Sequence, residues 1–93
     1  MNKHPSAQKR HRQSVKRQAR NTAIRSRVRT SVRRLRESIA SGNTAEAAER
    51  LQSATRAISK AATKGVFHRN TAARKISRLT LAVRKLGPAA ANG

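Results

Sequence analysis

The sequence predicts an all-α fold, an antiparallel three-helix bundle whose long, basic first helix overhangs its partners. Three observations predict this. Helix-breaking residues are confined to a few places, namely Pro5, Gly42, Gly65, Gly87-Pro88 and the terminal Gly93. Between them, apolar residues recur at steps of three and four, the period of one helix face. No stretch alternates apolar and polar residues as a strand would. At 93 residues, the chain forms one domain with a thin core.

The first uninterrupted segment, residues 6–41, contains neither Gly nor Pro. Its apolar residues are spaced by four, four, three and four, and they are Ile24, Val28, Val32, Leu35 and Ile39. A continuous helix here would be about 54 Å long, more than a domain of this mass needs, so part of it should project. Before Ile24, basic residues occupy every side. We therefore expect residues 1–20 to form a basic extension that is helical on a phosphate surface and frayed when free.

The second helix is predicted to open at Asn43, with Glu46 three residues later in the spacing of a capping box. Its predicted core face is alanine-rich, consisting of Ala47, Leu51, Ala54, Ile58 and Ala61 or Ala62. The third helix is predicted to start at an Asn70 cap and to end at Gly87-Pro88. Its core face comprises Ala72 or Ala73, Ile76, Leu79, Val83 and Leu86. Residues 21–87 thus form the bundle, and residues 88–93 form a flexible tail.

Positive charge dominates the chain and is unevenly distributed. Lys and Arg number 23 against three acidic residues, which gives a net charge of +20. Positions 1–36 hold 13 basic residues and no acidic residue, and positions 65–86 hold six basic residues and no acidic residue. Positions 37–64 hold four basic and three acidic residues. A solvated surface mixes both signs, so this excess indicates a dense anionic partner. The second helix is expected to face solvent, while the first and third bind the anion.

Several other function classes are disfavoured by the same sequence. Cysteine is absent, His4 and His11 lie in the stretch expected to fray, and His68 lies in a connection, so neither a metal site, a cofactor site nor a catalytic group is predicted. No apolar run is long enough to span a membrane, and a membrane-active amphipath would need a broad apolar face with aromatic anchors. The Arg-rich start also fits a mitochondrial transit peptide, but it runs without a break into the amphipathic pattern.

Nucleic acid is therefore the expected partner, and RNA is preferred to DNA. No helix-turn-helix spacing, zinc ligands or dimerising heptad is present to read a DNA major groove, and no homo-oligomer is expected. Phe67 is the only aromatic residue, so stacking of single-stranded bases is not favoured. The mode of recognition that remains is binding of RNA by its shape and its backbone. The alternative is a nucleoid-type protein that coats DNA non-specifically.

Three stretches carry a family resemblance that spans residues 6 to about 86. They are SAQKRHRQSVKRQARN (6–21), RSRVRTSVRRL (25–35) and, most specifically, SKAATKGVFHRNTAARKISRL (59–79). They resemble the bacterial small-subunit ribosomal protein S20 family. The resemblance implies a three-helix bundle that binds 16S ribosomal RNA directly, alongside other small-subunit components. It also implies a cytoplasmic, ribosome-associated protein of bacteria rather than of an organelle.

The resemblance further implies which residues contact the RNA. In the first helix these are Lys9, Arg10, Arg12, Lys16, Arg17, Arg20, Asn21, Arg25, Arg27 and Arg29, and Arg33 and Arg34 extend the set. In the later block they are Lys64, His68, Arg69, Asn70, Arg74, Lys75 and Arg78. The implied role is to neutralise phosphates and to stabilise the folded RNA during assembly, without catalysis.

Overall fold

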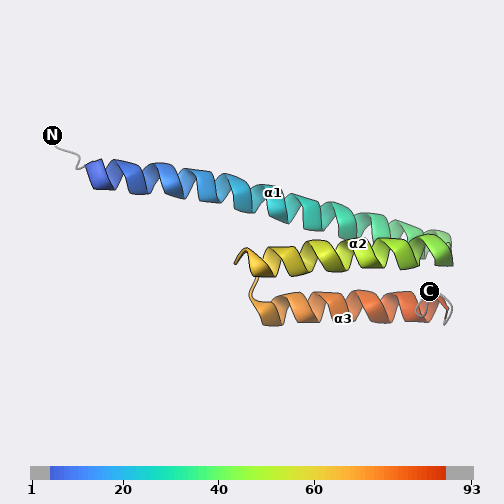
Figure 1. The fold of residues 1–93 in the computed structure, drawn as a ribbon. Coiled ribbons are helices and arrows are strands. Elements are labelled where there is room, and N and C mark those ends of the chain that lie inside the picture. Colours follow the sequence, from blue (N-terminus) through green and yellow to red (C-terminus); the bar gives the residue numbers. More distant parts are fainter. Residues whose placement is uncertain (1–4, 88–93) are drawn as a thin grey trace.

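A computed structural model of the chain describes residues 5–87 and consists of three helices. They are α1 (Pro5–Ser41), α2 (Thr44–Thr63) and α3 (Arg69–Leu86), and no strand occurs among the described residues. Each helix runs antiparallel to the one before it (Figure 1). The predicted all-α class and three-helix arrangement are confirmed. The predicted tail, residues 88–93, and residues 1–4 of the predicted extension lie outside the described residues.

Glycine ends the first two helices in the same way. Gly42 and Gly65 have φ angles of 75° and 79°, a conformation that glycine adopts without the steric cost of a Cβ atom. After α1, Gly42 N–H donates to Ile39 O at 3.1 Å and Asn43 N–H donates to Ser38 O at 3.2 Å. This hydrogen-bond pair is a Schellman motif, which satisfies carbonyls that the helix leaves without partners. The same pair recurs after α2, so both helices end where the sequence predicts.

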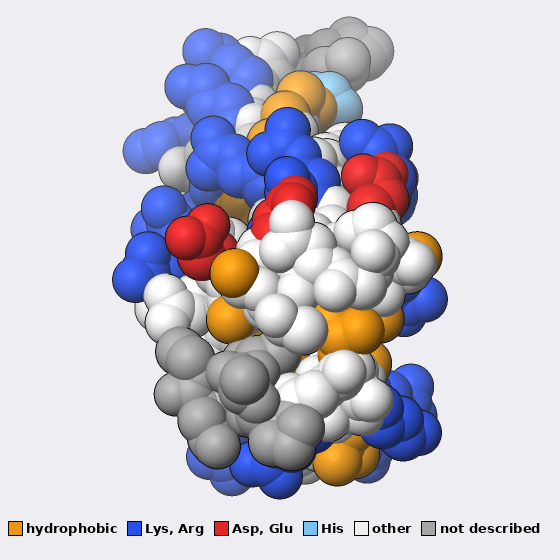
Figure 2. Space-filling view, turned by 90° about the vertical axis from the view of Figure 1, so that its right-hand side faces the viewer, with side chains coloured by type: hydrophobic (Ala, Val, Ile, Leu, Met, Phe, Trp, Pro, Cys, Tyr) orange, Lys and Arg blue, Asp and Glu red, His pale blue; other side chains and the backbone are white. Residues whose placement is uncertain are grey.

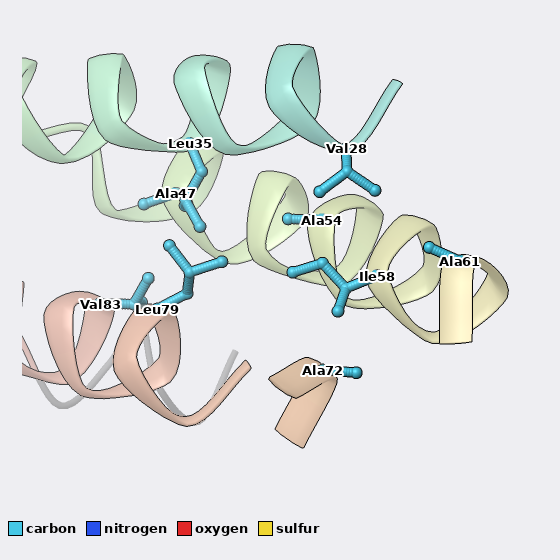
Figure 3. Packing of buried hydrophobic residues seen from close by; sticks show 9 residues of the cluster. All are labelled: Val28, Leu35, Ala47, Ala54, Ile58, Ala61, Ala72, Leu79 and Val83. Atoms are coloured by element: carbon cyan, nitrogen blue, oxygen red, sulfur yellow. The ribbon is translucent and has the colours of Figure 1, made fainter. Parts of the chain in front are cut away.

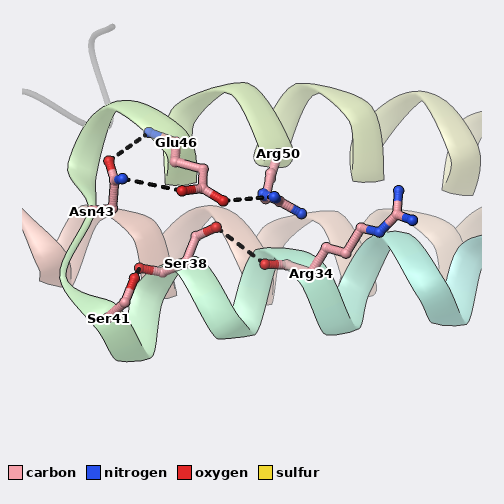
Figure 4. A network of polar contacts seen from close by, with 6 residues as sticks. All are labelled: Arg34, Ser38, Ser41, Asn43, Glu46 and Arg50. Carbon is pink, nitrogen blue, oxygen red and sulfur yellow. Dashed lines mark hydrogen bonds and ion pairs between the residues drawn. The ribbon is translucent and has the colours of Figure 1, made fainter.

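Asn43 caps α2, as predicted, but Glu46 does not complete the expected capping box. The Asn43 side-chain oxygen accepts from Glu46 N–H at 3.0 Å, and the Glu46 carboxylate accepts from the Asn43 side-chain amide at 3.1 Å (Figure 4). A capping box would bring that carboxylate to the Asn43 backbone N–H. This N–H is already bonded to Ser38 in the preceding turn. Glu46 instead contacts Arg50 at 2.6 Å.

The cap of α3 differs from the prediction. His68, not Asn70, is the N-cap residue, and its Nδ1 accepts from Asn70 N–H at 3.1 Å. Histidine is not among the preferred caps, whereas asparagine is, so residue preference alone favoured Asn70. The backbone of His68 is extended, with φ −66° and ψ 145°, and Arg69 after it is already helical, so the helix begins two residues earlier than predicted. Asn70 then lies inside the first turn and supplies the backbone N–H that is capped.

A narrow core holds the helices together (Figure 3). The largest fully buried side chains are Leu35 of α1, Ile58 of α2 and Val83 of α3. Between them, α2 presents alanines at steps of seven, which are Ala47, Ala54 and Ala61, all fully buried. A side chain this small lets neighbouring helices approach the α2 backbone closely. The predicted core faces of all three helices are confirmed, with Ala61 and Ala72 as the buried members of the two ambiguous pairs.

Helix α2 lies between the other two helices. It packs along both α1 and α3, whereas α1 and α3 contact each other little (Figure 1). The expectation that α2 faces solvent therefore holds only for its outer side, where Gln52, Arg56 and Ser59 are exposed. Its apolar stripe is wide enough for two neighbours because half-buried Leu51, Ala57 and Ala62 flank the central alanines. The helix with the least net charge thus separates the two basic helices.

The first half of α1 projects beyond the bundle, as predicted. Residues 7–20 are all exposed, Asn21 is the first half-buried residue, and Val28 is the first buried one. The described part of the molecule is consequently 64 Å long but only 22 Å and 15 Å across. Here α1 is one continuous helix from Pro5. Fraying of residues 1–20 in the absence of RNA stays a prediction.

Because the core is narrow, a small loss of volume should be measurable. Replacing Ile58 with Val should lower the free energy of unfolding by about 0.5–1.5 kcal/mol, the usual cost of one buried methylene group. Circular dichroism during urea unfolding measures this free energy. The control is Leu81→Ala, because Leu81 is 52% exposed and its truncation should change stability by no more than about 0.5 kcal/mol. Equal losses in both variants would contradict this assignment of the core.

Candidate nucleic-acid interface

The residues predicted to bind RNA are distributed over two helices and one connection. All of them are exposed except Asn21, which is half-buried. Twelve belong to α1, and they are Lys9, Arg10, Arg12, Lys16, Arg17, Arg20, Asn21, Arg25, Arg27, Arg29, Arg33 and Arg34. Lys64 and His68 lie in the α2–α3 connection, and Arg69, Asn70, Arg74, Lys75 and Arg78 lie on α3. These side chains are therefore accessible to a large partner.

Almost none of this charge is neutralised within the protein. Among the described residues, only Arg50 and Arg33 pair with a carboxylate: Arg50 with Glu46 at 2.6 Å, and exposed Arg33 with Glu37 at 3.9 Å. All three acidic residues belong to the half of the bundle near the α1–α2 turn. Figure 2 views the molecule from that end and shows red carboxylates with blue cationic groups around them. We call residues 7–20, the exposed part of α1 that projects beyond the bundle, the overhang. The charged side chains of the overhang and of α3 are all basic.

Cations line both walls of a hollow between α1 and α3. On one wall are Arg25 and Arg29 of α1, and on the other is Lys75 of α3. The floor is apolar and is formed by Val28, Val32 and Phe67. The Lys75 ammonium lies 5.4 Å from the centroid of the Phe67 ring, a cation–π distance. The lining residues include no acidic side chain, so the walls repel each other unless an anion lies between them.

A second hollow continues this arrangement further along the same two helices. Arg36 stands on its α1 wall and Arg78 on its α3 wall, with Ile39 and Leu79 among the floor residues. We call the two hollows together the α1–α3 furrow. Arg36 is absent from the residues predicted from the sequence, although it follows Arg29 by seven positions. Two helical turns bring such positions to nearly the same side, so the spacing alone indicated it.

Two predicted residues of α1 belong to another side of the helix. Arg27 follows Arg25 by two residues, which turns its direction by about 200°, away from the furrow. Arg34 lines a hollow between α1 and α2 whose other residues include Glu46, Glu49 and Arg50. That hollow mixes both signs of charge. The set Arg25, Arg27 and Arg29 is thus divided by the structure, with only the first and last in the furrow.

Asn21 and His68 have local surroundings that the sequence did not indicate. Asn21 lies where α1 leaves the bundle, and its Oδ1 is buried without a hydrogen-bond partner, the one such side-chain atom among the described residues. His68 uses its Nδ1 to cap α3. Neutral imidazole then carries its proton on Nε2, which makes this atom a donor for an acceptor outside the protein.

Two other kinds of feature are absent from the described residues. No group of three His, Cys, Asp or Glu residues among them is placed to hold a metal ion. None of the three helices in the described range is long and apolar enough to cross a membrane. What the arrangement can do chemically is bind phosphate groups through exposed, unpaired guanidinium and ammonium groups on more than one side of α1.

Comparison with known proteins gives a consistent result across nearly the whole chain. A family model described as ribosomal protein S20 matches residues 2–84. The small ribosomal subunit protein bS20 of Anaeromyxobacter dehalogenans strain 2CP-C is 54% identical over 86 residues, which cover 92% of this chain and 94% of the relative. The protein of the same name from Syntrophotalea carbinolica is 53% identical over 87 residues, 94% of this chain and 100% of the relative. The protein of the same name from Paracoccus denitrificans is 51% identical over 85 residues, which cover 91% of this chain and 96% of the relative.

The capping role of His68 can be separated from any external contact. His68→Ala removes the acceptor for the Asn70 N–H and should destabilise the free protein by about 1 kcal/mol, as the loss of other N-caps does. His68→Asn supplies a side-chain oxygen instead and should stay close to wild-type stability. Urea unfolding measures both variants, and faster hydrogen exchange at the Asn70 amide in His68→Ala locates the effect. Wild-type stability and exchange in that variant would rule out the cap.

Proposed function

This chain belongs to the ribosomal protein S20 family, and on that premise we propose that it is a structural constituent of the small ribosomal subunit that binds 16S ribosomal RNA directly through α1 and α3. The family is one of structural, non-enzymatic ribosomal proteins, and no catalytic role is assigned. The observation that carries the proposal is the α1–α3 furrow, whose two walls hold five cations and whose lining residues hold no acidic side chain: Arg25, Arg29, Arg36, Lys75 and Arg78.

The proposed mechanism is electrostatic. Each phosphate that a guanidinium or ammonium group neutralises releases condensed counterions, and this release drives binding. Cations lie on the furrow side of α1, at Arg25 and Arg29, and on another side, at Arg27. RNA segments on different sides of the helix can therefore be held by the same rigid rod. Lowering the repulsion between them stabilises one folded arrangement of the RNA, with the backbone rather than the bases recognised.

The proposal also includes a cellular location and binding partners for the protein. Relatives named for the small ribosomal subunit suggest a ribosome-associated protein of the bacterial cytoplasm, next to other components of that subunit. Sedimentation of a cell lysate in a sucrose gradient, followed by immunoblotting at low and moderate salt, tests this directly. Comigration with the small subunit at both salts is expected. Migration with the nucleoid, and none with the subunit, would favour a DNA-coating protein instead.

The role of the furrow is tested by the salt dependence of binding to 16S ribosomal RNA. If six to ten phosphates are contacted, the logarithm of the wild-type binding constant should fall with a slope of about −5 to −9 against the logarithm of salt concentration. Arg25→Gln combined with Arg29→Gln should make that slope shallower by about 1.4–1.8, because two phosphate contacts are lost. Filter binding over a salt series measures it.

A matched double variant controls for the loss of charge. Arg56 on α2 and Arg84 on α3 are exposed, and neither lines a hollow of the furrow. Replacing both with Gln removes the same two charges and should leave the slope within about 0.5 of the wild-type value, since neither contacts a phosphate in this arrangement. Equal flattening by the two double variants would mean that net charge, and not the furrow, determines binding.

A further inference from the structure

The side of α1 that packs on α2 continues into the overhang as a basic surface. Ile24 packs against the core, and residues that precede it by seven and fourteen positions face nearly the same way. Those residues are Arg17 and Arg10, and Arg20 stands beside them one turn from Ile24. All three arginines are exposed. Where α2 ends, the apolar stripe that it covers is therefore replaced by guanidinium groups that face the space beyond the end of α2.

The end of the bundle that carries the α2–α3 connection lies at an angle to this basic surface of the overhang. The α2–α3 connection lies directly beneath the point where α1 leaves the bundle (Figure 1), and Val66 and Phe67 of the connection pack on the core together with Ile24. On the outside of this end, Lys64, His68 and Arg69 are exposed. Because His68 Nδ1 is occupied by the cap of α3, the remaining donor is Nε2–H. The two surfaces form an inside corner.

We propose that this corner, formed by Arg10, Arg17 and Arg20 of the overhang and by Lys64, His68 and Arg69 of the bundle end, seats one double-stranded segment of RNA, with a strand against each wall. The proposal rests on the proposed function, because it specifies which RNA structure occupies one part of the protein. No carboxylate lies on either wall, since all three acidic residues belong to the other end of the bundle. The corner is thus complementary to a dense polyanion over its whole area.

A duplex fits this corner better than a single strand does. Single strands are held by aromatic side chains on which bases stack. The one aromatic residue, Phe67, is half-buried, and the ammonium of Lys75 lies over its ring. Double-stranded RNA instead offers two phosphate backbones and the 2′-hydroxyls of a wide, shallow minor groove. The exposed overhang, about 21 Å from Ala7 to Arg20, is long enough to follow one backbone across that groove while the bundle end contacts the other.

The absence of cysteine from the chain allows a direct test. An iron–EDTA cleavage reagent can be attached at Gln13→Cys, on the corner side of the overhang between Arg10 and Arg17, or at Thr63→Cys, at the end of α2. Both positions are exposed. With each labelled protein bound to 16S ribosomal RNA, the two reagents should cleave one and the same RNA helix, on opposite strands. Gln52→Cys on the outer side of α2 is the control and should not cleave that helix.

The outcomes separate this inference from the proposed function. If the wild-type protein does not bind 16S ribosomal RNA, the proposed function fails. If the labelled proteins bind but the reagents at positions 13 and 63 cleave different RNA helices, only the shared duplex is overturned. No cleavage from either position, in a complex where binding is intact, would mean that the corner is empty or faces a protein, and would overturn it equally.

A pair of single variants tests the orientation of the overhang. Arg17→Gln removes a charge from the corner, whereas Arg12→Gln removes one from a position turned away by about 140°. Arg17→Gln should weaken binding to 16S ribosomal RNA about two- to fivefold, the range of an exposed ion pair, and Arg12→Gln should weaken it less. An effect of Arg12→Gln equal to or larger than that of Arg17→Gln would place the RNA on another side of α1 and contradict the corner.

Discussion

Repulsion between like charges is the constraint on which this fold depends. A net charge of +20 must be held by a core in which only Leu35, Ile58 and Val83 are large and fully buried. The chain meets this constraint by its order of helices. The nearly neutral α2 stands between two basic helices, so that α1 and α3 each bury apolar surface against it without packing closely on each other. Repulsion is thereby reduced, and an open furrow is left between them.

The alanine stripe of α2 makes this arrangement possible. Ala47, Ala54 and Ala61 let α1 and α3 approach the α2 backbone closely while Leu and Ile side chains from three helices fill the space between. A larger residue at these positions would push the outer helices apart and widen the furrow. The dimensions of the proposed anion-binding surface are thus set by residues that do not line it. Core packing and the proposed binding are linked through one helix that carries little charge itself.

Much of the fold was predictable, because its determinants are local. Gly42 and Gly65 end helices through positive φ angles that few other residues adopt, and the apolar steps around Val28 and Leu35 identify a buried face without knowledge of the partner helix. The cap of α3 was not predictable in this way. His68 takes that role because its backbone is extended directly before the helix, and residue preference carries no information about backbone angles.

The candidate site was predictable as a list of residues but not as a surface. The family resemblance implied Arg25, Arg27 and Arg29 equally, whereas the rotation of α1 about its own axis relative to α2 places only two of them in the furrow. Arg36 was missed although its spacing from Arg29 indicated the same side. The division into furrow and corner depends on where α2 ends relative to α1. That relation is tertiary, and no window of the sequence contains it.

The order of packing also has a consequence for how quickly the protein folds. Nearly all contacts between helices join α1 to α2 or α2 to α3, which are neighbours along the chain, and few join α1 to α3. Such a topology has a low contact order, and helical proteins of this kind fold in microseconds to milliseconds. Each hairpin closes a loop of only a few residues, so the entropy of closure is small. The bundle of a newly made chain is consequently complete soon after α3 leaves the exit tunnel, and the furrow is formed before any partner binds.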